Sequence, residues 1–212
     1  MKRRAFLAAS LPALLAACGA DNNWAPEDRV RVARYTSPEP PAITLLTVIG
    51  IPRGEGGHTA LLINGSQRVL YDPAGSWTHP HLPERHDVWY GINDQIRDFY
   101  IDYHTRSNYW LAEDTLPVTR EVADIAIRRV EAQGPANKSF CAIESSRALR
   151  GVPGFESVPV AWSPLRLRDW FLRQPGVRSR EWRDGDPRLI HNVRMQRKDG
   201  TYTGNAAAQP AR

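Results

Sequence analysis

Long hydrophobic runs, clustered basic residues and cysteines are all scarce in this chain. Its longest apolar run, Ala5 to Ala17, is shorter than the roughly 20 residues that span a bilayer, which argues against a transmembrane helix. The arginines are interspersed with acids and form no basic stripe, so we expect no nucleic-acid partner. Only two of the 212 residues are cysteines. A composition of 42% hydrophobic and 24% charged residues is that of one ordinary globular domain.

The N-terminus has the layout of an export signal. Three basic residues, Lys2, Arg3 and Arg4, precede the apolar run, and small residues stand immediately before Cys18. "LAAC" resembles the lipobox of bacterial lipoproteins, which implies that Cys18 is lipidated and holds the protein on the membrane. "RRAFL" resembles a twin-arginine signal, although the short basic region also suits the general secretory route. We therefore expect a lipid-anchored protein on the periplasmic side of a bacterial cell envelope.

Loss of the signal changes the charge and the cysteine count. The three basic residues account for three of the five net positive charges, so the mature chain carries +2. We divide the chain into a signal peptide (1–17), a polar, proline-bearing tether (18–41), one folded domain (42–198) and a disordered tail (199–212). If Cys18 carries lipid, Cys141 is the single thiol of an exported domain. It is then either a buried structural cysteine or a reactive one.

Hydrophobic periodicity predicts an α+β domain in which an antiparallel sheet packs on two or three helices. A turn at "NGS" joins two short apolar runs, which is a strong hairpin signal. Thr119 is a good N-cap, and Ser163-Pro164 is a typical helix start. The expected strands are 42–51, 58–63, 67–72, 96–104 and 109–118, and the expected helices are 120–133, 139–151 and 164–175.

Three residues suggest nucleophilic chemistry. Cys141 falls in the first turn of its expected helix, capped by Ser139 or Lys138, where free N–H groups and the helix dipole lower a thiol pKa. A thiolate needs a histidine partner, and the histidine needs an orienting group. A hairpin loop centred on Gly65 places His58 opposite Asp72, on one face of the sheet. A two-residue loop would instead turn Asp72 to the other face.

The order of these elements resembles a known superfamily. A strand beginning "GHTALLINGSQRVLYD", followed by a late helix that starts at a cysteine, is similar to the circularly permuted branch of the papain-like NlpC-type superfamily, which includes lecithin:retinol acyltransferase-like enzymes. The resemblance implies a permuted papain-like fold with Cys141 as nucleophile, His58 as base and Asp72 as orienting group. Members often have asparagine before the cysteine, where this chain has Phe140.

The expected activity is that of a thiol hydrolase or acyltransferase acting on amide, ester or thioester bonds, with a cell-wall peptide or a lipid as substrate and no cofactor. The alternative is a noncatalytic envelope lipoprotein that keeps the fold and binds a peptide, glycan or metal. His79, His81 and His86 in the "HPHLPERHD" loop form a weak candidate metal site, because their spacing is not that of common zinc sites.

Overall fold

A single antiparallel sheet organises the molecule. The computed structural model describes residues 22–106, 108–189, 195–196 and 202–203. Seven strands pair in the order β4-β5-β3-β2-β1-β6-β7, and every pairing is antiparallel. Their bounds are β1 Ala42–Gly50, β2 Gly56–Asn64, β3 Arg68–Tyr71, β4 Glu84–Arg85, β5 Val88–Tyr90, β6 Tyr109–Pro117 and β7 Arg178–Trp182. A separate two-stranded pair joins β8 (Met195–Gln196) to β9 (Tyr202–Thr203).

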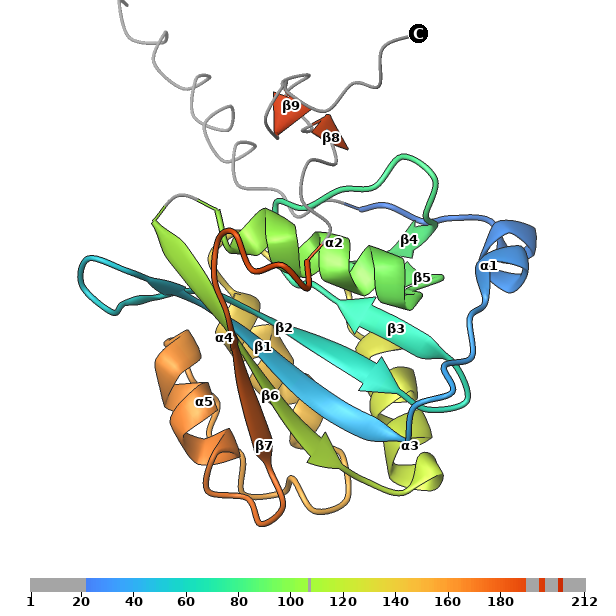
Figure 1. The fold of residues 1–212 in the computed structure, drawn as a ribbon. Helices are drawn as coiled ribbons and strands as arrows, with labels where there is room; N and C mark the ends of the chain where they lie inside the picture. Colours follow the sequence, from blue (N-terminus) through green and yellow to red (C-terminus); the bar gives the residue numbers. More distant parts are fainter. Residues whose placement is uncertain (1–21, 107, 190–194, 197–201, 204–212) are drawn as a thin grey trace, which may run out of the picture.

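Helices cover both faces of the sheet. The helices are α1 Glu27–Ala33, α2 Asp94–His104, α3 Arg120–Glu131, α4 Cys141–Leu149 and α5 Pro164–Phe171. Helices α3, α4 and α5 lie on one face and α2 lies on the other (Figure 1). The expected α+β class with an antiparallel sheet is confirmed, with the addition of a helix on the second face.

The central strand β1 is covered by helices on both faces, which explains its continuous apolar sequence. Ile43 and Leu45 of β1 point into the cluster under α3, α4 and α5, whereas Leu46 and Val48 of the same strand point into the cluster under α2. Successive strand residues face opposite sides of a sheet. A strand covered on both faces therefore needs apolar side chains at nearly every position, as the wholly buried β1 has.

The segment 96–104, expected as a strand, is helix α2. The Asn93 side chain accepts a hydrogen bond from the Ile96 backbone N–H at 2.9 Å and so caps the helix. Ile96, Phe99, Tyr100 and Tyr103 recur at three- and four-residue spacing and pack on the sheet. The aromatic and β-branched content suggested a strand, but the helical spacing and the cap decide the structure.

Residues 22–41, expected within the tether, instead pack on the domain. Val30 of α1 is buried in the core, and the Ala25 N–H donates to the Glu84 carbonyl at 2.9 Å. The Arg68 N–H donates to the Tyr35 carbonyl at 2.8 Å, which ties this segment to the first residue of β3. The polar, proline-bearing composition suggested a linker, but enough of its groups find partners on the domain to hold it there.

The other helices begin close to their expected positions. Thr119 caps α3, its hydroxyl accepting from the Val122 N–H at 3.3 Å. Pro164 is the first residue of α5. Helix α4 begins at Cys141, and neither Lys138 nor Ser139 caps it; Ser139 has φ 69° in the turn before the helix. The expected signal peptide and Cys18 lie outside the described residues, as does the expected tail except for β9.

Candidate active site

Cys141 is the first residue of helix α4, and this helix packs against β2. The residue is 7% exposed, and its sulfur accepts hydrogen bonds from the Thr59 and Ala142 backbone N–H groups. Burial raises the pKa of the thiol, but the hydrogen bond and positive charge of His58, together with these backbone groups, bring the pKa below its ordinary value of 9.0. The site therefore favours a thiolate.

His58 lies between Cys141 and Asp72. Its Nε2 is 2.6 Å from Asp72 Oδ1, and the ring also hydrogen-bonds with the Cys141 thiol. Because Asp72 occupies Nε2, Nδ1 is the nitrogen left to face the sulfur. Burial lowers the pKa of His58, but the Asp72 charge and the hydrogen bonds to Asp72 and Cys141 outweigh it and raise the pKa to about 10. The raised pKa of His58 and the lowered pKa of Cys141 both favour the imidazolium and thiolate form of the pair.

Asp72 is almost fully buried and is held in place from two sides. The Tyr100 hydroxyl donates to the same Oδ1 that His58 contacts, at 2.7 Å. A Cβ atom added at Gly75 would overlap Asp72 Oδ2, so the chain passes too close for any side chain at that position. Burial raises the pKa of Asp72, but the charge and hydrogen bond of His58 and the Tyr100 hydrogen bond bring it below its ordinary value. Asp72 thus stays ionised.

The hairpin brings His58 and Asp72 together in a different register from the expected one. Asn64 pairs with Arg68, so the loop is 65–67 and Asp72 falls opposite Ala60 rather than His58. The shift is by two residues, an even number, so both side chains remain on the same face. A diagonal neighbour is still within reach of a histidine side chain. The pair expected from the sequence therefore forms, although by diagonal contact.

Two residues of α2 complete the site, and the sequence reasoning missed both. Tyr100 holds Asp72, and the ring of His104, one turn later, stacks on the ring of His58 with centroids 5.8 Å apart and planes 13° apart. The His104 Nδ1–H donates to the Tyr100 carbonyl at 2.8 Å. Burial and the neighbouring His58 charge lower the pKa of His104 to about 4, so it is neutral where His58 is charged. Two signals in the sequence could have indicated this helix and its two site residues: Asn93 as a helix cap, and the four-residue spacing of Tyr100 and His104.

An aromatic pair includes the residue that precedes Cys141. Phe140 immediately precedes Cys141, and its ring contacts the edge of Trp162 with centroids 5.0 Å apart. Trp162 is 71% exposed, which is unusual for so large an apolar side chain. The residue before Cys141 therefore belongs to a partly exposed aromatic pair.

The three histidines of the 79–86 loop do not form a metal site. His79 and His81 are neighbours, with ring centroids 5.9 Å apart, but the His86 Nε2 lies 2.8 Å from Asn22 Oδ1 and its ring contacts Trp24. Among the residues that the structure describes, no three histidine, cysteine or acidic side chains are grouped as metal ligands. His86 therefore does not lie with His79 and His81, as the weak metal alternative would require, because it contacts Asn22 and Trp24 instead.

Comparison of the chain with protein-family models, curated proteins and solved structures gave no match. Within the described ranges, none of the helices combines the length and hydrophobicity needed to cross a membrane.

Proposed function

We propose that this protein is a thiol-dependent hydrolase or acyltransferase that cleaves amide, ester or thioester bonds, with Cys141 as nucleophile. The observation that carries the proposal is the position of His58, which hydrogen-bonds with Cys141 on one side and lies 2.6 Å from Asp72 on the other. A nucleophile, a base and a group that orients the base are the parts of a catalytic triad. A structural cysteine needs none of these partners.

The geometry supports a two-step reaction. The Cys141 thiolate attacks the substrate carbonyl carbon, forming a C–S bond and an oxyanion. The intermediate collapses as the bond to the leaving group breaks, and the leaving group takes the proton of the His58 imidazolium. Neutral His58 then removes a proton from water or an acceptor, whose oxygen or nitrogen attacks the thioester. The C–S bond breaks and restores the thiolate and imidazolium, while Asp72 keeps the ring oriented.

We further propose that the domain is a permuted member of the papain-like superfamily. The chain order of histidine on a strand, an orienting residue after the next strand, and cysteine opening a later helix supports this proposal. Phe140 replaces the asparagine that often precedes the cysteine in that superfamily. The Phe140–Trp162 pair supports a substrate with an apolar group next to the scissile bond, such as a lipid acyl chain or an apolar residue of a cell-wall peptide.

The activity can be tested with a small activated ester before the natural substrate is identified. Full-length protein mixed with p-nitrophenyl acetate should release a burst of one nitrophenolate per molecule and carry one acetyl group on Cys141 by mass spectrometry. Cys141→Ala should show no burst, and Cys141→Ser should show one only at a much lower rate. Absence of a burst, with Cys141 no more reactive than free glutathione at pH 6, would favour the noncatalytic alternative.

We propose that lipid on Cys18 anchors the protein to the bacterial envelope, on the periplasmic side. The support is the lipobox-like "LAAC" that follows a basic and apolar N-terminus. Expression in bacteria fed radiolabelled palmitate should label the wild-type chain, and Cys18→Ser should abolish the label. Label retained in that variant would contradict lipidation at this cysteine.

A further inference from the structure

A cavity lies on the face of the sheet that α2 covers, at the end remote from Cys141. Its volume is about 300 Å³, the lower end of the range for small-molecule sites. Strand β2 runs from His58, in the candidate active site, to Asn64, in the cavity wall. At 3.3 Å per residue, that separation is about 20 Å. The cavity is therefore distinct from the proposed active site.

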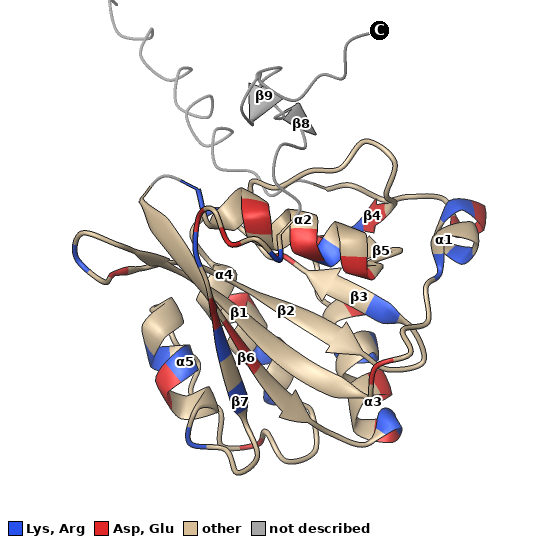
Figure 2. Ribbon diagram, viewed as in Figure 1, with Lys and Arg blue, Asp and Glu red and all other residues tan. Residues whose placement is uncertain are grey.

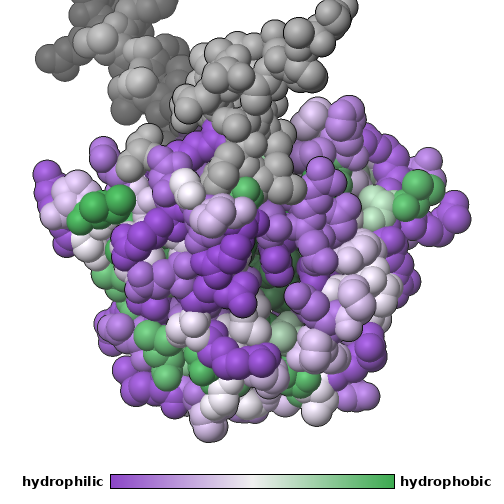
Figure 3. Space-filling view, in the orientation of Figure 1, coloured by the Kyte–Doolittle hydropathy of each residue, from purple (hydrophilic) through white to green (hydrophobic). Residues whose placement is uncertain are grey.

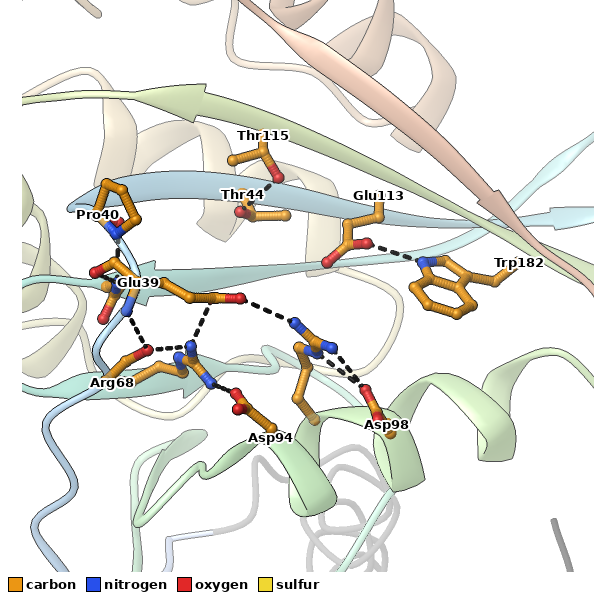
Figure 4. A network of polar contacts seen from close by, with 12 residues as sticks. Glu39, Pro40, Thr44, Arg68, Asp94, Asp98, Glu113, Thr115 and Trp182 are labelled. Carbon is orange, nitrogen blue, oxygen red and sulfur yellow. Dashed lines mark hydrogen bonds and ion pairs between the residues drawn. The ribbon is translucent and has the colours of Figure 1, made fainter. Parts of the chain in front are cut away.

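The floor of this cavity is polar although it is part of the sheet. The Thr44 and Thr115 hydroxyls are 3.0 Å apart on paired strands β1 and β6. Glu113, 8% exposed, accepts the Trp182 indole N–H at 2.8 Å through Oε2. Figure 4 shows these floor residues beside the network formed by Glu39 and Arg68. Hydroxyl and carboxylate groups thus occupy positions where the same face carries apolar side chains further along the strands.

The inner wall holds two buried polar atoms without a partner. Arg68 is 1% exposed; its terminal nitrogens bond with Asp94 and Glu39, each at 2.6 Å, and with Ser37, but its Nε–H has no acceptor within the described part of the chain. Asn64 is 7% exposed; its amide nitrogen donates to two backbone carbonyls, but its Oδ1 has no donor there. Buried polar atoms are rarely left unsatisfied, so this wall is polar and incompletely paired within the described part of the chain.

The rim adds positive charge. Arg178 and Arg180 of β7 are exposed and line the cavity, and in the described ranges neither is in an ion pair. Figure 2 shows these basic segments on β7, and hydrophilic residues dominate this face in Figure 3. Arg97 is engaged by Asp98 at 2.8 Å and, more weakly, by Glu39. The two β7 arginines are therefore the cations available to a ligand.

We propose that this cavity is a second binding site for a small hydroxylated organic anion, of the sugar-acid or sugar-phosphate kind. Hydroxyl groups both donate and accept, which matches the Thr44 and Thr115 hydroxyls and the Glu113 carboxylate on the cavity floor. Arginine is suited to carboxylate and phosphate groups, which matches the rim. The proposal does not depend on the proposed hydrolase activity, and the two can fail separately.

Isothermal titration of the full chain with four probes tests this site. D-Glucuronate and D-glucose 6-phosphate combine hydroxyls with an anionic group, whereas D-glucose and acetate each carry only one of these features. At least one of the two hydroxylated anions should bind saturably and at least tenfold more tightly than glucose or acetate; which one it is distinguishes carboxylate from phosphate. Equal binding of glucose, or no saturable binding of either anion at millimolar concentration, would overturn the proposal.

Variants on the exposed strand give a second readout without risk to folding. Arg178→Gln combined with Arg180→Gln should weaken binding of the hydroxylated anion at least tenfold, because charge-assisted hydrogen bonds are lost. Arg53→Gln, an equivalent change at an exposed position outside the cavity, should leave the affinity unchanged. Cys141 alkylation should stay the same in all these variants. Undiminished binding in the double variant would show that the anion binds elsewhere and would refute the site.

Discussion

Substitution of Asp72 by asparagine should lower the reactivity of the Cys141 thiol while the cysteine itself stays in place. The pKa of His58 is about 10 against an ordinary 6.5. Each pKa unit is worth about 1.4 kcal/mol, so the surroundings favour the imidazolium by a net of about 5 kcal/mol after the cost of burial. Asparagine keeps the size of the side chain and an oxygen for hydrogen bonding, but it removes the charge that opposes the burial of His58. The ring should then be largely neutral at pH 7.5.

Loss of the imidazolium should raise the pKa of the thiol. Coupling between the two groups is reciprocal, so a neutral His58 withdraws its support from the thiolate. Burial then raises the pKa of Cys141, opposed only by the Thr59 and Ala142 N–H groups. A thiol of pKa 9 is ionised in only about one molecule in a thousand at pH 6. We therefore expect Asp72→Asn to slow alkylation of Cys141 at pH 6 at least tenfold.

The assay is the pseudo-first-order rate of iodoacetamide labelling, followed by mass spectrometry of the Cys141 peptide. Asp169→Asn makes the same chemical change at an exposed position of α5 and should react like the wild type. Thermal melting by circular dichroism confirms that both variants are folded. If folded Asp72→Asn is labelled within twofold of the wild-type rate, Asp72 does not sustain the ion pair and the reasoning is refuted.

Three further predictions concern the support of this site. Gly75→Ala should displace the Asp72 side chain and lower thiol reactivity, whereas Gly134→Ala, which meets open space, should not; equal labelling rates would contradict this. Tyr100→Phe removes a hydrogen bond to a buried carboxylate and should cost about 1.5–3 kcal/mol of unfolding free energy in urea titrations, and a loss below 0.5 kcal/mol would count against it. His104 has its pKa lowered from 6.5 to about 4, so its contribution to stability is present above pH 6.5 and is lost as the pH falls toward 4, by up to about 3 kcal/mol. His104→Asn, compared with the wild type by urea titration at several pH values, should remove that part of the acid destabilisation; identical slopes would refute it.

Part of the site could be read from the sequence because it depends on local rules. The apolar runs on either side of the "NGS" turn predicted the two strands of the hairpin. An odd-length loop was enough to set His58 and Asp72 on the same face of the sheet. The position of Cys141 at a helix start followed from the spacing of apolar residues, which becomes helical after the last expected strand. These features survive an error of two residues in register, because side chains on a strand alternate with period two.

Tertiary structure decided the rest. Segment 96–104 has the composition of a strand but the spacing and Asn93 cap of a helix, and only its packing against the sheet brought Tyr100 to Asp72 and His104 to His58. Residues 22–41 read as a linker until their partners on the domain are seen. The sequence by itself determined which residue types could form a thiolate, imidazolium and carboxylate array. Only the fold decided which neighbours keep those charges in place, because burial and long-range hydrogen bonds set a pKa and have no signature in local sequence.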